Sequence, residues 1–107
     1  MEIVVVWSDS AIDELRDIYD YFRSKAGNRI ADKMVNAIVD QTLILEQSPR
    51  IGQIEELLTY LNMEIRYLIS SNYKIVYMID ENLITIATVF DCRQNPKKLK
   101  NKNIDRK

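Results

Sequence analysis

The second half of the chain contains three consecutive β-rich runs that are separated by very short polar segments. The runs cover residues 63–70, 73–79 and 83–93, and the polar links are Ser71-Asn72 and Asp80-Glu81-Asn82. Runs rich in β-branched and aromatic residues favour strands, and polar links of this length favour hairpins. The pattern predicts an antiparallel meander of three strands, and this meander constrains how every other segment can pack.

The first half adds one strand and two helices. Residues 2–7 form a β-branched run that predicts a first strand. Apolar residues then recur at steps of three and four, which predicts an amphipathic helix over about 10–25 and a second one from Asn28 to about Gln47. Gly27 suits the end of the first helix, and Pro49 ends the second. Residues 48–62 are expected to be mainly loop, of a length that is often functional.

These elements predict one α+β domain over residues 1–107, in the order β-α-α-β-β-β, with about 97–107 as a basic tail. The two helices form a hairpin that packs on one face of an antiparallel sheet. The first strand is expected to join the same sheet, since a lone strand has no hydrogen-bonding partner. The other face of the sheet is expected to stay at least partly open, where a binding site would lie.

Composition excludes several classes of function. The sequence has no histidine, a single cysteine (Cys92) and two glycines. It therefore lacks the usual zinc ligands, a Ser–His or Cys–His nucleophile pair and a glycine-rich phosphate loop, so we expect no metal and no cofactor. No apolar run approaches 18 residues, and the first residues do not resemble a signal peptide. We expect a cytoplasmic protein with no membrane contact.

The net charge of −1 hides an uneven distribution. Residues 1–60 hold 6 Lys and Arg against 11 Asp and Glu, whereas residues 61–107 hold 9 against 5. This split predicts acidic helices and a basic end that meets an acidic partner or nucleic acid. The candidates for partner contact at this end are Arg93, Asn95, Lys97 and Lys98.

Without histidine, any catalysis would rest on cations, tyrosines and carboxylates of the meander. No catalytic residue is assigned, and the candidates are Arg66, Tyr73, Lys74, Tyr77 and Arg93, with Asp91 nearby. A two-residue turn at Ser71-Asn72 places Arg66 opposite Tyr77 and puts Lys74 on the other face. A two-residue turn at Glu81-Asn82 would put Asp91 and Arg93 on the Lys74 face, and a three-residue turn would put them on the Arg66 face.

The order of elements and several motifs resemble the RelE/ParE superfamily, the toxins of type II toxin–antitoxin systems. The resemblance covers about residues 2–100. It is carried by S-D-S-A-I-D-E-L-R-D-I-Y-D-Y after Trp7, S-P-R-I-G at 48–52, R-Y-L at 66–68, N-Y-K-I-V-Y at 72–77 and V-F-D-C-R-Q-N-P at 89–96. The last of these runs is typical of the ParE-like, plasmid-stabilisation branch.

The resemblance implies a small toxin held inactive by a cognate antitoxin. An antitoxin segment is expected to pack across the helical hairpin or to extend the sheet, and DNA is expected to be contacted only indirectly, through the antitoxin. ParE-like members inhibit DNA gyrase and are not known as nucleases. RelE-like members are metal-independent, ribosome-dependent mRNA endonucleases.

The residues of this chain favour the ParE-like alternative. Lys74 stands where RelE-like enzymes have arginine, and Glu64 lies on the strand where RelE has basic residues. Arg93 matches the arginine near the end of the last strand. A cleavage site must stabilise a highly charged phosphoryl transition state, which fewer cations do less well. The resemblance therefore predicts gyrase inhibition without enzymatic activity, with mRNA cleavage and a non-toxic, antitoxin-binding homologue as alternatives.

Overall fold

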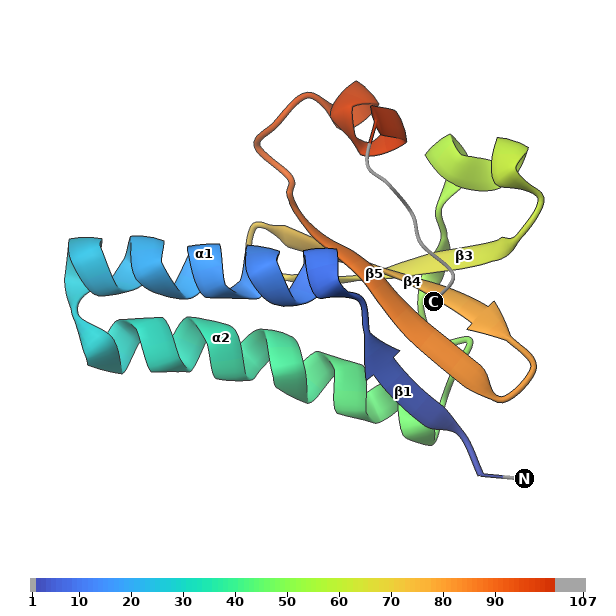
Figure 1. Ribbon diagram of the computed structural model, residues 1–107, viewed down its shortest axis with the longest axis horizontal. Helices are drawn as coiled ribbons and strands as arrows, with labels where there is room; N and C mark the ends of the chain where they lie inside the picture. The colour runs from blue at the N-terminus through green and yellow to red at the C-terminus, as the bar shows by residue number, and fades with distance from the viewer. Residues whose placement is uncertain (1, 102–107) are drawn as a thin grey trace.

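The computed structural model describes residues 2–101, and its main body is a helical hairpin beside a five-stranded sheet (Figure 1). The strands are β1 (Val4–Trp7), β2 (Gln53–Ile54), β3 (Glu64–Ser70), β4 (Tyr73–Asp80) and β5 (Leu83–Asp91). The helices are α1 (Asp9–Ala26) and α2 (Asn28–Leu43), with short 3-10 helices η1 (Ile44–Glu46), η2 (Glu56–Leu61) and η3 (Pro96–Asn101). The predicted α+β class is confirmed.

The sheet has the order β1-β5-β4-β3-β2. The predicted meander β3–β4–β5 is antiparallel, whereas β1 joins the sheet parallel to β5, so the sheet is mixed. Residues 48–62 are more regular than predicted: they contain β2, which pairs antiparallel with β3, and η2. The dipeptide β2 is too short to leave a strand signal in the sequence, because it is held by its pairing with Arg66 and Tyr67.

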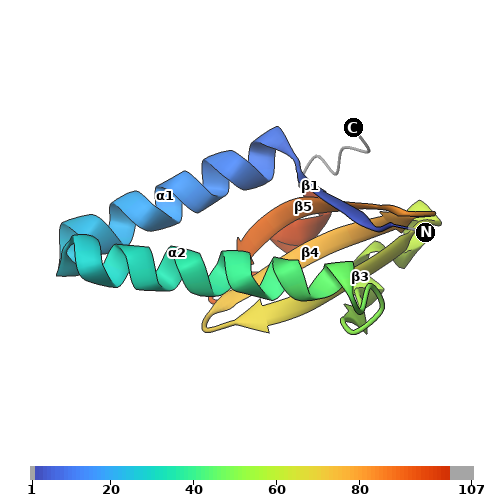
Figure 2. The same ribbon diagram turned by 90° about the horizontal axis from the view of Figure 1, so that it is seen from below.

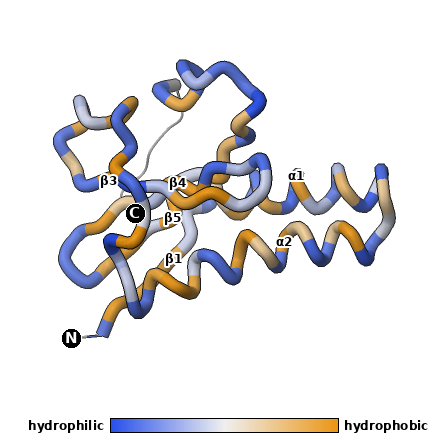
Figure 3. Tube along the Cα trace, turned by 180° about the vertical axis from the view of Figure 1, so that it is seen from behind, coloured by the Kyte–Doolittle hydropathy of each residue, from blue (hydrophilic) through white to orange (hydrophobic). Residues whose placement is uncertain are grey.

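The helical hairpin forms because each helix has one apolar stripe and a defined end. Along α1 and α2 hydrophobic and hydrophilic residues alternate (Figure 3). The Ser8 hydroxyl accepts from Ala11 N and donates to Ala87 O, which fixes the start of α1 on β5. Gly27, with φ of +92°, ends α1 and is also the residue before α2, whose first residue is Asn28. The hairpin covers one sheet face, and its turn end projects beyond the sheet (Figure 2).

The register of the last hairpin differs from both alternatives that the sequence left open. Asp80 pairs with Leu83, so the turn has two residues, Glu81 and Asn82. A β-bulge then inserts one residue, since Tyr77 pairs with Ile86 but Val76 pairs with Thr88. The bulge returns Asp91 to a position opposite Tyr73. A two-residue turn therefore does not place Asp91 on the Lys74 face.

The second face of the sheet is not left open as expected. A cluster of buried side chains lies there, and η2 and η3 cover it; its members are Leu58, Ile65, Val76, Met78, Ala87, Phe90 and Leu99. The first part of the basic tail expected from about residue 97 forms η3, which continues to Asn101, and Leu99 within it is fully buried. Residues 102–107 of that tail lie outside the described residues. No helix in residues 2–101 is long and apolar enough to cross a membrane.

Candidate functional site

A groove of about 520 Å³ opens between α1 and the end of β5, on the helix side of the sheet. It exists because α1 packs on β5 near Ser8 and then extends past the end of the strand. Its walls are Glu14, Asp17, Ile18 and Tyr21 from α1, Tyr73 from β4, and Val89, Phe90, Asp91, Arg93 and Gln94 from β5 and the turn that follows. Of the predicted candidates, the structure brings Tyr73 and Arg93 together here.

Arg93 is held at the groove by Asp91. Its Nε and Nη2 donate to the two carboxylate oxygens of Asp91 at 3.0 and 2.8 Å, and its backbone N–H donates to Oδ1 at 2.9 Å. These hydrogen bonds hold the pKa of Asp91 below its usual range, and the same contact raises the pKa of Arg93. Half of the Arg93 side chain remains exposed, so it can still meet a partner.

The tyrosines of the groove differ in their exposure. Tyr73 is buried against the helical hairpin, and this burial, together with the charge of Asp91, raises its pKa. Tyr21 lies on α1 and is 47% exposed. Its ring packs edge-on against Phe22 at a centroid distance of 5.1 Å. The groove thus presents one exposed aromatic ring and one guanidinium, two side chains that are enriched at the centres of protein interfaces.

Sequence reasoning missed Glu14, which joins α1 to the strand beyond the bulge. Its carboxylate accepts from Thr88 Oγ1 at 2.8 and 2.9 Å and from Val89 N at 2.9 Å. Glu14 lies three residues after Ala11 and four before Ile18, the two buried positions of α1. A carboxylate on the apolar face of a helix is the signal that could have identified it.

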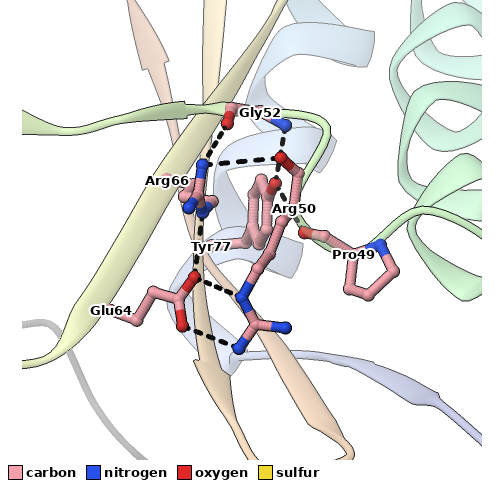
Figure 4. A network of polar contacts seen from close by, with 6 residues as sticks. All are labelled: Pro49, Arg50, Gly52, Glu64, Arg66 and Tyr77. Atoms are coloured by element: carbon pink, nitrogen blue, oxygen red, sulfur yellow. Dashed lines mark hydrogen bonds and ion pairs between the residues drawn. The ribbon is translucent and has the colours of Figure 1, made fainter.

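Arg66 and Tyr77 are candidates that the structure places elsewhere, in a network that holds the loop after α2 (Figure 4). Tyr77 is fully buried; its hydroxyl donates to Pro49 O at 2.9 Å and accepts from Gly52 N at 3.0 Å. Arg66 Nη1 donates to Gly52 O at 2.8 Å. Burial raises the pKa of Tyr77, so the phenol stays protonated and can keep donating. Both residues therefore hold the loop after α2 in place.

Glu64 completes this network with two arginines. It accepts from Arg50 Nε at 2.8 Å, from Arg50 Nη2 at 2.9 Å and from Arg66 Nε at 2.9 Å (Figure 4). The hydrogen bond from Arg50 is the main reason that the pKa of Glu64 is lowered; burial opposes it, and the hydrogen bond from Arg66 lowers the pKa further. Glu64 thus acts as an ion-pair partner on the strand where the resemblance looked for a further cation.

The lowered pKa of Glu64 predicts a specific loss of stability in acid. A carboxyl with a lower pKa in the folded state stabilises the fold above its unfolded pKa of about 4.3, and this contribution is lost as the pH falls through the folded pKa. The free energy of unfolding should therefore fall less between pH 5 and pH 3 in Glu64→Gln than in the parent. Urea titrations at a series of pH values measure this, and parallel curves would contradict it.

Lys74 lies on the opposite side of the sheet from the groove. Its Nζ is 2.7 Å from Glu55 Oε2 and 4.3 Å from the centre of the Tyr67 ring. Only 3% of the Glu55 side chain is exposed, and its other oxygen accepts from Leu57 N at 3.2 Å. The pair fastens the start of η2 to β4. Lys74 is therefore bound in an ion pair with Glu55 and lies on the face of the sheet opposite to Arg93 and Tyr73.

The predicted contact residues after β5 are exposed. The Asn95 side chain accepts from Lys97 N at 3.0 Å and its carbonyl accepts from Lys98 N at 2.9 Å, which orders the start of η3. Lys97 and Lys98 make no ion pair within residues 2–101. Both lysines are exposed. In the same range we find no group of three or more carboxylates or cysteines that could hold a metal ion.

Comparison with known proteins agrees with the resemblance seen in the sequence. A family model described as the ParE toxin of the type II toxin-antitoxin system, parDE, matches residues 5–96. A chain from a solved structure, the chromosomal ParDE TA system from P. aeruginosa, shares the fold with a TM-score of 0.70 and 22% identity, over 83% of this chain and 95% of that chain. No curated protein gives a significant match. The chain belongs to the ParE toxin family of type II toxin–antitoxin systems.

Proposed function

We propose that this toxin acts in the cytoplasm by inhibiting DNA gyrase through protein contact, without catalysing a reaction itself. Its role as the toxin of a parDE-type module follows from its family, and so does a cognate antitoxin as partner. The gyrase target rests on the ParE-like branch to which the chain belongs and on how the charged side chains are used. The ribosome and its mRNA are the competing target.

The observation that carries this proposal is the dispersal of the candidate cations. Lys74 is paired with a buried carboxylate on one face of the sheet, and Arg66 is bound to Glu64 and to a backbone carbonyl at the loop. Arg93, in the groove, shares its charge with Asp91. A metal-independent nuclease needs several cations converging on one phosphate. The described residues instead offer a surface for binding.

The groove is the best candidate for the inhibitory surface. It is concave, it carries the exposed Tyr21 ring and the Arg93 guanidinium, and the Glu14 contacts to β5 hold its walls in place. A pre-formed surface of this kind binds without a large ordering cost. The antitoxin would neutralise the toxin most simply by covering the same groove, across the helical hairpin.

The proposal predicts that the purified toxin blocks gyrase supercoiling and that Tyr21→Ala weakens the block by about tenfold, the expected loss for an aromatic interface anchor. Tyr60→Ala is the matched control, because Tyr60 is 60% exposed on η2, away from the groove lining. Titration of the toxin into a supercoiling assay gives the concentration for half-inhibition. Full supercoiling at excess toxin would refute the gyrase target.

The mRNA alternative keeps one favourable feature, the position of Arg93 beside Tyr73 in the groove. Mapping of mRNA ends after induction separates the two activities. Intact messages in growth-arrested cells support the binding mechanism, whereas cuts within codons that disappear in Arg93→Ala would establish the nuclease. Normal growth during full expression would indicate a homologue that only binds its antitoxin.

A further inference from the structure

The basic segment that follows β5, residues 93–100, combines a high density of cations with a fixed backbone, and most of it lies outside the groove. It carries Arg93, Lys97, Lys98 and Lys100 and contains no acidic residue. It is also ordered at both ends. Asn95 accepts hydrogen bonds from the start of η3, and Leu99 is fully buried in the second hydrophobic cluster. The buried leucine fixes η3 on the sheet, so the lysines on either side of it are presented to solvent.

We propose that this segment contacts the phosphate backbone of duplex DNA. The choice of duplex DNA rests on the proposed gyrase target, because gyrase holds such a duplex while it is inhibited. Lysine ammonium groups on a fixed turn suit phosphates, which recur regularly along a duplex. The Asn95 side-chain oxygen accepts from Lys97 N and orders the turn, and lysine contacts to phosphates carry no sequence information, so the contact is independent of sequence.

The small net negative charge of the whole chain does not oppose this contact. The acidic residues concentrate in the first half of the sequence, mainly on the helical hairpin, whose turn end lies away from η3 (Figure 1). Closer to the segment, Glu14 and Asp17 line the groove with Arg93, and Glu55 and Glu56 lie at the start of η2. The molecule is 39 Å long, whereas charges are screened over about 10 Å in 0.1 M salt. A duplex at η3 therefore experiences mainly the charges of η3 and of the neighbouring η2, where Glu55 is already paired with Lys74. This differs from the expectation that DNA is met only through the antitoxin.

Nearby side chains leave these lysines available. Within the described residues, Lys97, Lys98 and Lys100 form no ion pair. Lys100 lies 6.0 Å from the centre of the Tyr60 ring, a contact that leaves its charge intact. Of the two carboxylates at the start of η2, Glu55 is already bound to Lys74. The three lysines therefore keep their positive charge unpaired within the described residues, whereas Arg93 is paired with Asp91.

The test is binding of the full chain to a labelled duplex of about 20 base pairs, measured by fluorescence anisotropy over a series of salt concentrations. We expect Lys97→Glu/Lys98→Glu to weaken binding by at least about tenfold and to make the log–log salt slope shallower by about two. The matched control is Arg29→Glu/Lys33→Glu, which makes the same charge change on exposed positions of α2. Circular dichroism confirms that both variants fold.

The outcomes separate this inference from the proposed function. Equal losses in the two double variants would overturn it, because the effect would then follow net charge and not the basic segment. A parent toxin that inhibits gyrase but does not bind the duplex even at low salt would also overturn it and leave gyrase inhibition standing. A toxin that binds the duplex through Lys97 and Lys98 without inhibiting gyrase would support the DNA contact and refute the gyrase target.

Discussion

Gly52→Ala is expected to destabilise this toxin by about 3 kcal/mol, because the added methyl group has no space. A Cβ at Gly52 would lie 2.5 Å from the Tyr77 hydroxyl and 2.6 Å from the carbonyl oxygen of Tyr67. Neither neighbour can retreat cheaply. The Tyr77 ring is fully buried in the core, and the Tyr67 carbonyl belongs to β3. The loop must move instead, and it then loses the Gly52 N–H to Tyr77 hydrogen bond.

Urea denaturation of the parent and the variant measures this loss, with Gln47→Ala, at an exposed position after η1, as the control. The control should change the free energy of unfolding by less than about 0.5 kcal/mol. The double variant Gly52→Ala/Tyr77→Phe should remain strongly destabilised, since the clash with the backbone carbonyl persists. Recovery of parental stability in the double variant would show that the carbonyl clash is not real.

The same contact explains a motif that the sequence offered without a reason. In the sequence, Pro49 predicts the end of the second helix, but Gly52 stands out only through the resemblance to relatives. The structure shows that the Tyr77 hydroxyl joins the carbonyl of Pro49 to the N–H of Gly52, and that only a residue without a side chain fits there. The pairing of Arg66 with Tyr77 was predictable from the two-residue turn at Ser71-Asn72. The structural role of this pair could not be predicted, because the loop that Arg66 and Tyr77 hold comes from a distant part of the sequence.

The β-bulge in β5 limits how far the site itself could be predicted. Turn length fixes register only when the strands pair without interruption, and one extra residue reverses which side chains face the helices. The bulged residue, Ala87, accepts a hydrogen bond from the Ser8 hydroxyl at the start of α1, and Glu14 binds the strand just beyond it. Both contacts are tertiary and leave no local signal. Local patterns therefore predicted the hairpins but left open whether Asp91 and Arg93 share a face with Tyr73 or with Lys74.

Lys74 was a catalytic candidate because of its position in the sequence, but in the structure it forms an ion pair with the buried Glu55. We expect Lys74→Met to destabilise the protein by about 3 kcal/mol, because it leaves the carboxylate of Glu55 buried without its cation. Lys33→Met, at an exposed position on α2, should cost less than about 0.5 kcal/mol. Urea denaturation compares the two, and similar small losses in both would contradict the buried ion pair.

A second substitution separates structural from catalytic use of Lys74. In Lys74→Met/Glu55→Gln the buried charge is removed, and the glutamine oxygen can still accept from Leu57 N, so most of the lost stability should return. If Lys74 only fastens η2 to β4, this double variant should arrest growth as the parent does. If Lys74 stabilised a cleaved phosphate, the double variant would be stable yet inactive, and mRNA cuts would vanish with it. Measuring both growth arrest and stability of the double variant therefore decides whether Lys74 only stabilises the fold or also takes part in a reaction.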